Sequence, residues 1–138
     1  MTGETNKFDI AIIGAGPAGL SFALGLTNTS LRIIVIERSS SNVLEMPPDD
    51  GREIALTHSS KKELINIGVW SEIEKKCISK IKEAKVFNGN SPYSLNFDHE
   101  ETAERCLGYL VPNCKIRAAA YKKVREQNNI KILCDTLM

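Results

Sequence analysis

The residues of this chain that are best suited to chemistry lie in one short glycine-rich stretch. It has the pattern G-x-G-x-x-G and consists of Gly14, Ala15, Gly16, Pro17, Ala18 and Gly19. Gly14 permits a sharp turn out of a strand, Gly16 lets backbone approach a pyrophosphate because it has no Cβ, and Gly19 lets a helix pack closely. Pro17 fits the first helical turn, where its missing N–H needs no partner. The pattern therefore predicts a phosphate-binding loop at a helix N-terminus.

An acidic residue follows at the position that such a loop needs. Glu37 ends an apolar run 18 positions after Gly19, and there its carboxylate would accept hydrogen bonds from both ribose hydroxyls of an adenosine. A 2′-phosphate would clash with Glu37, which disfavours NADP; Arg38 either offsets that clash or is a plain surface residue. The motif alone leaves FAD and NAD open. The alternative, a tight turn in an unrelated α/β protein, does not explain why the glycines and the acid keep this spacing.

These residues need a strand, a helix and a second strand to position them. Residues 8–13 are apolar with one aspartate, which predicts a strand buried on both faces. Small and apolar residues predict a helix over 17–27, and the β-branched run 31–36 predicts the second strand. Such a βαβ unit implies a parallel sheet with a right-handed crossover. The predicted fold class is therefore α/β, a Rossmann-like domain with a parallel sheet.

The rest of the chain predicts shorter elements. Residues 39–51 have the composition of a loop, and a helix over 59–67 would end at Gly68. A second short helix would follow, with Ser71 as N-cap and Glu74 completing a capping box. Further strands are expected at 53–57, 84–87, 93–97, 107–111 and 130–134, and a further helix at 115–127. The lysines and arginines of that last helix would form a solvated face.

Composition excludes several classes of function. The 138 residues suffice for one domain, and a net charge of +1 gives no argument for binding nucleic acid. No apolar run is long enough for a transmembrane helix. The four cysteines form no C-x-x-C pair, so they indicate no metal site and are interpreted as reduced thiols. With a polar N-terminus, this favours a cytoplasmic protein.

Two further stretches are more specific than the glycine motif. They are DGREIALTHSSKKELINIGVW at residues 50–70 and LGYLVPN at residues 107–113. With the glycine motif, they closely resemble the ubiquinone-biosynthesis branch of the FAD-dependent aromatic hydroxylases. These are flavoprotein monooxygenases related to para-hydroxybenzoate hydroxylase. The resemblance runs over essentially the whole chain, and it implies FAD as the cofactor and NAD(P)H as the reductant.

The resemblance also implies roles for single residues. Arg52 matches the family arginine that lies along the FAD, against the alternative of an exposed loop residue. Asn113 matches a position whose side chain bonds the FAD, although the sequence supports a plain helix N-cap equally well. His58 and His99 match no catalytic position. The expected cofactor-binding set is Gly14, Ala15, Gly16, Pro17, Ala18, Gly19, Glu37, Arg38, Arg52 and Asn113, with no catalytic residue and no metal ligand.

In that family, reduced flavin takes up O₂ as a C4a-hydroperoxide, which hydroxylates an electron-rich phenol ring. The flavin supplies the chemistry and the protein supplies position and desolvation. The implied substrate is a polyprenyl phenol, which would suggest peripheral contact with the inner membrane.

Family members are more than twice as long as this chain. Residues 1–138 are therefore expected to be a truncated N-terminal FAD-binding domain, inactive alone and without a complete substrate domain. A complementary C-terminal chain is a partner to expect. Two other hypotheses stay open: a non-catalytic dinucleotide-binding remnant or partner-binding module, and a fragment of an NAD-dependent dehydrogenase.

Overall fold

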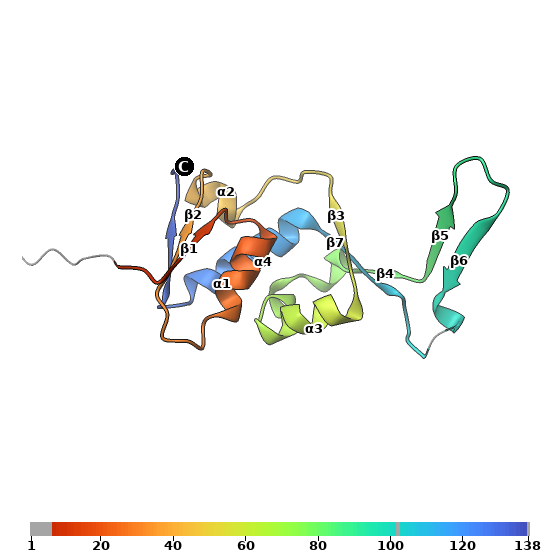
Figure 1. Ribbon diagram of the computed structural model, residues 1–138, viewed down its shortest axis with the longest axis horizontal. Coiled ribbons are helices and arrows are strands. Elements are labelled where there is room, and N and C mark those ends of the chain that lie inside the picture. The colour runs from red at the N-terminus through yellow and green to blue at the C-terminus, as the bar shows by residue number, and fades with distance from the viewer. Residues whose placement is uncertain (1–6, 102, 138) are drawn as a thin grey trace, which may run out of the picture.

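The fold begins with a parallel sheet, which we call sheet A. The computed structural model describes residues 7–101 and 103–137. Sheet A has the strand order β1-β2-β8, with β1 at Ile10–Ile13, β2 at Ile33–Ile36 and β8 at Ile130–Leu133. The helices α1 (Pro17–Gly25) and α4 (Asn113–Arg125) lie beside it (Figure 1). The predicted α/β class and the βαβ unit are confirmed.

The inner face of sheet A carries the core. Ile33 and Val35 of β2 are fully buried, and they pack with Leu20 of α1 and with Ala120 and Val124 of α4 in one hydrophobic cluster. Side chains alternate along each strand, so every second residue faces the two helices. The small alanines on α4 allow the helices to approach each other and the sheet closely.

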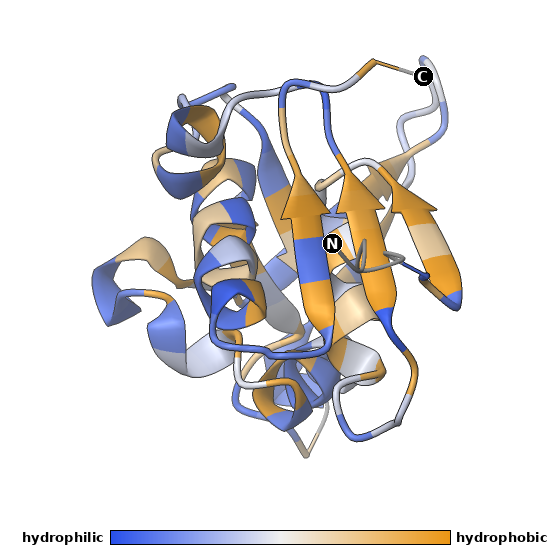
Figure 2. Cartoon of the chain, turned by 90° about the vertical axis from the view of Figure 1, so that its left-hand side faces the viewer, coloured by the Kyte–Doolittle hydropathy of each residue, from blue (hydrophilic) through white to orange (hydrophobic). Residues whose placement is uncertain are grey.

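The other face of sheet A, here called the outer face, is uncovered by any described helix or strand (Figure 2). The outer face consists of Ala11, Ile13, Ile34, Ile36, Lys131 and Leu133. Ile13 is 61% exposed and Leu133 is 40% exposed. The prediction that residues 8–13 form a strand buried on both faces is therefore wrong for this structure, because helices pack on one face only.

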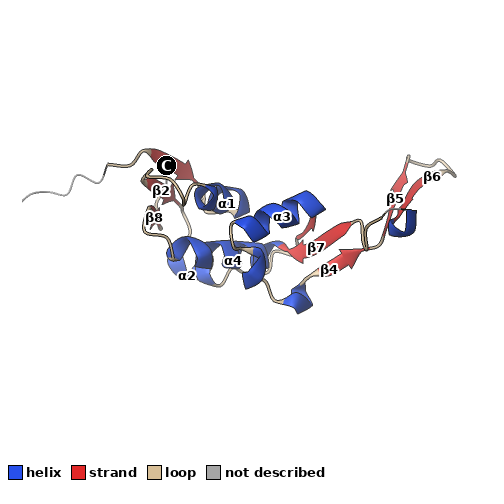
Figure 3. Cartoon of the chain, turned by 90° about the horizontal axis from the view of Figure 1, so that it is seen from below, coloured by secondary structure: helices blue, strands red, loops and turns tan. Residues whose placement is uncertain are grey.

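A second, antiparallel sheet, called sheet B, lies beyond the helices (Figure 3). Its order is β3-β7-β4, with β3 at Glu53–Leu56, β7 at Gly108–Pro112 and β4 at Ser79–Ile81. The helix α3 (His58–Asn66) follows β3. Beyond sheet B, the strands β5 (Glu83–Phe87) and β6 (Ser94–Asp98) form a hairpin that projects from the body of the molecule.

Two local predictions need correction. Residues 39–51 contain a helix, α2 (Ser41–Glu45), because Leu44 can bury its side chain almost completely in the core. The helix expected from Ser71 is instead two 3-10 turns, η1 (Trp70–Glu72) and η2 (Lys75–Cys77), separated by Ile73 in an extended conformation. Ser71 lies inside η1, and its hydroxyl donates to the Gly68 carbonyl.

The end of α3 and two further short elements complete the secondary structure. Gly68 ends α3 as predicted, with a φ of +75°. Short elements that were not predicted are β4 and the 3-10 turn η3 (His99–Glu101).

The four cysteines are all free thiols. Among the described residues, no helix has the length and apolar character to cross a membrane. Residues 1–6, which make up most of the polar N-terminus, lie outside the described residues.

Candidate dinucleotide site

The glycine-rich loop connects β1 to α1 in the geometry that its sequence predicts. Gly14 has a φ of +97°, a conformation that other residues rarely adopt, and its N–H donates to the Ile36 carbonyl. Gly16 is the N-cap of α1, and a Cβ added there would meet no atom within 4 Å. A Cβ on Gly19 would collide with the Gly14 carbonyl oxygen. The space at Gly16 is thus open to a ligand, while Gly19 is required by packing.

The helix N-terminus next to this space offers hydrogen-bond donors. The first bond within α1 runs from the Leu20 N–H to the Gly16 carbonyl, so the N–H groups of Ala18 and Gly19 precede it. Pro17 at the first position has no N–H to satisfy. These groups, together with the helix dipole, suit the negative charge of a phosphate.

Glu37 ties the end of β2 to the glycine loop. Its Oε2 accepts the Ala15 N–H at 2.7 Å and its Oε1 accepts the Ser39 N–H at 2.8 Å, and the residue is 9% exposed. Burial alone would raise the pKa of Glu37, but these two N–H groups and the charge of Arg117 outweigh burial, so the pKa is lowered. The carboxylate is therefore ionised near neutral pH. Each oxygen keeps a lone pair for a further donor, such as a ribose hydroxyl.

A groove of about 310 Å³ opens beside this carboxylate. Glu37 and the exposed Arg38 line it together with Gly14. Thr136 and Leu137 close it from the C-terminal segment, which the Thr136 N–H anchors to the Glu37 carbonyl at 3.0 Å. These last two residues were missed by the sequence reasoning, since nothing in their types marks them as neighbours of Glu37.

Arg52 and Asn113 meet at a third residue that the sequence reasoning did not single out. Asp50 Oδ2 accepts Arg52 Nε at 3.0 Å, Arg52 Nη2 at 2.5 Å and Asn113 Nδ2 at 2.7 Å. Asn113 begins α4 with Pro112 as the N-cap, and it makes no side-chain cap. The interpretation of Asn113 as a plain N-cap is therefore wrong, because its side-chain amide donates to Asp50.

A mainly apolar groove of about 400 Å³ joins the glycine loop to Asn113. Pro17 and Ala18 of α1 line it on one side, and Ile54 and Leu56 of β3 line it on another. The structure thus brings the start of α1 and the start of α4 to one groove. Glu37 and Arg38 lie at the separate groove beside Gly14.

Arg117 and His58 lie outside the predicted cofactor-binding set. Arg117 lies one turn after Asn113 on α4, and its Nε is buried without a hydrogen-bond partner. His58 has its Nε2 2.8 Å from the Cys106 carbonyl oxygen, and its ring contacts Tyr109 edge-on. These contacts give His58 a role in packing α3 against β7.

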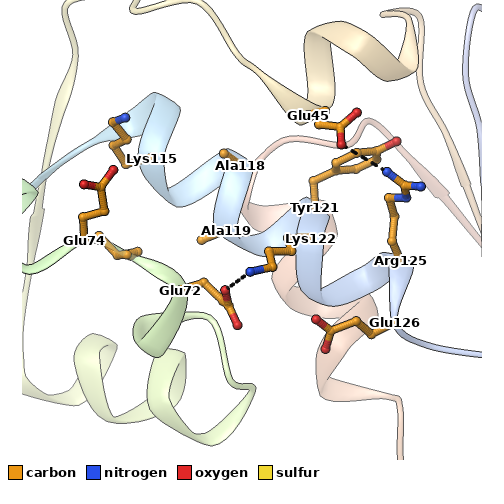
Figure 4. Close-up of a pocket in the computed structure, with 11 residues that line it drawn as sticks. Glu45, Glu72, Glu74, Lys115, Ala118, Ala119, Tyr121, Lys122, Arg125 and Glu126 are labelled. Atoms are coloured by element: carbon orange, nitrogen blue, oxygen red, sulfur yellow. Dashed lines mark hydrogen bonds and ion pairs between the residues drawn. The ribbon is translucent and has the colours of Figure 1, made fainter.

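A further groove, of about 480 Å³, lies over α4 and is rimmed by charged side chains (Figure 4). Lys122 donates to Glu72 at 2.6 Å, and Arg125 donates to Glu45 at 3.4 Å. The groove shares no lining residue with the glycine loop or with the Arg52 cluster. Lys122 and Arg125 are exposed and paired with carboxylates, as expected for a solvated helix face, whereas the Nε of Arg117 on the same helix is buried.

The glycine turn, the open helix N-terminus and the acid at the end of the second strand together define a dinucleotide-binding α/β domain. Residues 8–135 match the model of the family described as pyridine nucleotide-disulphide oxidoreductase, and the chain belongs to that family.

Curated relatives confirm the resemblance to ubiquinone-biosynthesis hydroxylases. The chain is 47% identical over 134 residues to the ubiquinone hydroxylase UbiM of Neisseria meningitidis, a match that covers 94% of this chain and 29% of the relative. It is 25% identical over 126 residues to the 3-demethoxyubiquinol 3-hydroxylase of Escherichia coli, covering 90% of this chain and 32% of that enzyme.

Solved structures share the fold. A variant of PqsL from P. aeruginosa superposes with a TM-score of 0.72 at 17% identity, covering 94% of this chain and 34% of that one. The p-nitrophenol 4-monooxygenase PnpA from Pseudomonas putida gives a TM-score of 0.66 at 19% identity, covering 91% and 31%. The chain thus spans about a third or less of the length of these relatives.

Proposed function

We propose that this chain supplies the adenosine and pyrophosphate half of the FAD site of a flavin-dependent monooxygenase. The reaction would be hydroxylation of a polyprenyl phenol in ubiquinone biosynthesis, with NAD(P)H as the reductant. The single observation that carries the proposal is the identity to a ubiquinone hydroxylase over nearly the whole chain. The geometry of the glycine loop and Glu37 supports it, since both fit a dinucleotide.

The residues of this chain would bind and orient the cofactor. Glu37 would accept the ribose hydroxyls, and the start of α1 would face the pyrophosphate across the open space at Gly16. Arg38 would border the adenosine, and Arg52 and Asn113 would bind farther along the FAD. The FAD, when bound, supplies the oxygen-transfer chemistry. We assign no catalytic side chain to this chain.

The surfaces of the chain support a partner that completes the site. The outer face of sheet A is mainly apolar apart from Lys131, and β1 has a free edge because it pairs only with β2 among the described strands. An uncovered face and edge favour association with another polypeptide. A complementary chain equivalent to the remaining length of the relatives is the partner that this account expects, and activity would require it.

A chimaera tests this proposal. Residues 1–138 would replace the matching N-terminal segment of the Neisseria hydroxylase, with Gly25→Ala as the control variant and Gly16→Val as the disabling one. We expect the parent and control chimaeras to retain FAD on purification and to restore ubiquinone synthesis in a hydroxylase-deficient strain. A soluble, folded parent chimaera that retains no FAD would contradict the proposal.

The other two hypotheses predict different results. A non-catalytic binding remnant would retain FAD in the chimaera without restoring synthesis. An NAD-dependent fragment, which Glu37 permits, would be stabilised by NAD and not by FAD. The 50–70 and 107–113 segments favour FAD, because they carry the resemblance to the hydroxylases.

A further inference from the structure

We propose that Asp50 is the residue that positions Arg52 and Asn113 for the dinucleotide. This inference deepens the proposed function and rests on it, because Arg52 and Asn113 are themselves proposed cofactor-binding residues. Nothing in the glycine motif requires an acid at position 50. The contacts of its carboxylate carry the inference.

Asp50 joins two side chains that are 61 positions apart in the sequence. Its Oδ2 takes the Nε and Nη2 groups of Arg52 and the amide of Asn113, while its Oδ1 accepts the Arg52 N–H at 3.1 Å. The backbone closes the same ring, since the Asn113 N–H donates to the Arg52 carbonyl at 2.8 Å. The loop before β3 is thereby fixed to the first residue of α4.

Arg52 and Asn113 differ in their exposure, and the carboxylate of Asp50 is a hydrogen-bond partner for both. Arg52 has a side chain that is 67% exposed, so packing alone does not hold its rotamer. Asn113 is 3% exposed, so its amide needs a partner inside the protein. Asp50, with a side chain 26% exposed, lies between them and connects the exposed guanidinium to the rigid helix start.

The arrangement leaves donors free for a phosphate. With Nε and Nη2 of Arg52 bonded to Asp50, the Nη1 group has no partner in the described structure. A guanidinium held along one edge presents its remaining N–H groups in a fixed plane, which suits phosphate oxygens. The hydrogen bonds from Arg52 and Asn113 hold the pKa of Asp50 well below its usual range, so the carboxylate stays ionised near neutral pH.

A matched pair of variants tests the role of Asp50. Asp50→Asn removes the charge that holds Arg52, whereas the control Asp49→Asn changes a neighbouring acid whose Oδ1 accepts the Gly51 N–H. In Asp50→Asn the Arg52 side chain would be mobile in the free protein and would lose conformational entropy when FAD binds. We therefore expect FAD affinity to fall roughly ten- to thirtyfold in this variant. We expect affinity to stay unchanged in Asp49→Asn.

A double-variant cycle separates positioning from general damage to the fold. If Asp50 acts through Arg52, Asp50→Asn should weaken FAD binding far less in the Arg52→Gln background than in the parent chain. Damage to the fold would weaken binding equally in both backgrounds. Equal effects, or an Asp50→Asn variant that binds FAD as tightly as the parent or more tightly, would overturn the proposal.

A second measurement needs no FAD. The Nε–H signal of Arg52 in ¹H–¹⁵N NMR spectra of the free chain should be that of an ordered side chain, and Asp50→Asn should make it mobile. An Arg52 that is equally mobile in both would overturn the proposal. If the parent chain binds no FAD while Arg52 is ordered by Asp50, FAD binding by this chain fails and the positioning role stands.

Discussion

Glu37 links the stability of the chain to pH at the scale of a single residue. Its pKa in the folded chain is below the ordinary value of 4.5, so the unfolded chain binds more protons in the range just below that value. The stabilisation is therefore complete above about pH 4.5 and is lost as the pH falls through the folded-state pKa. We expect the free energy of unfolding to decrease over this range in the parent chain.

The variant Glu37→Gln should lack this part of the pH dependence, because it carries no titrating carboxylate. Urea unfolding at a series of acidic pH values measures the effect, with Glu53→Gln as a control at an exposed acid on β3. Parallel curves for the parent and Glu37→Gln would contradict the assignment of the two backbone donors to this carboxylate.

The second and third glycines of the motif should differ in their effect on stability. Gly19→Ala places a methyl group against the Gly14 carbonyl, and overpacking of this kind costs about 1–3 kcal/mol. Gly16→Ala fills open space and should leave the free energy of unfolding nearly unchanged. Denaturant unfolding of the two variants measures this difference, and a reversed order would show that the loop geometry is wrong.

At this scale the sequence predicted residues whose roles depend on local spacing. Gly14, Gly16, Gly19 and Glu37 belong to one βαβ unit, so their pattern is visible along the chain. Asp50 was not predicted as a partner of Asn113, because that contact depends on β3 pairing with β7. A pattern in one segment carries no information about such a contact.

At the scale of elements, the end of α3 offers a prediction. Gly68 has a φ of +75°, so Gly68→Ala forces a left-handed conformation that costs about 1 kcal/mol. Gly25 is the last residue of α1, has no positive φ and has open space around it, so Gly25→Ala should be neutral or stabilising. Thermal unfolding of the two variants should give shifts of different sign or size. Equal destabilisation would contradict this view of the α3 terminus.

Elements with strong periodicity were predicted and short ones were not. β1, α1 and β2 follow from their apolar patterns, and α4 follows from Ile116, Ala120 and Val124 on one face. The five-residue helix α2 and the three-residue strand β4 form because tertiary contacts hold them, with Leu44 buried in the core and β4 paired to β7. Their sequences are too short for a periodic signal.

At the scale of the whole molecule, the uncovered surfaces predict self-association. The outer face of sheet A is mainly apolar, and Phe87 and Tyr93 of the projecting hairpin region are 67% and 83% exposed. An isolated two-stranded hairpin is only marginally stable in water. We therefore expect the purified chain to associate in a concentration-dependent way, which analytical ultracentrifugation would show.

The variant Ile13→Lys should reduce this association, because it places a charge on the outer face at an exposed residue of the edge strand β1. Phe22→Lys, at a residue 58% exposed on α1, serves as a control of similar exposure away from that face. A parent chain that stays monomeric at high concentration, or an equal effect of both variants, would contradict the role of the outer face.

The overall architecture could be predicted only in part. The βαβ unit indicates a parallel sheet, but burial on both faces was inferred from composition alone, and the structure covers one face. A strand with apolar residues on both faces indicates that both faces can be buried, but it does not identify the elements that bury them. The relatives are about three times as long as this chain.

FAD binding by the purified chain tests the central claim most directly. Flavin fluorescence and thermal unfolding would be followed during titration with FAD, with NAD as the control ligand. At FAD concentrations about a hundred times the Kd, we expect stabilisation of about 2.7 kcal/mol and a rise in Tm of roughly 8–10 °C.

The variants decide which residues are responsible. The account predicts that the FAD effect is abolished in Gly16→Val and weakened in Glu37→Ala, with both variants still folded. A folded parent chain whose fluorescence and Tm do not respond to FAD, or respond to NAD alone, would contradict the claim that this chain holds half of an FAD site.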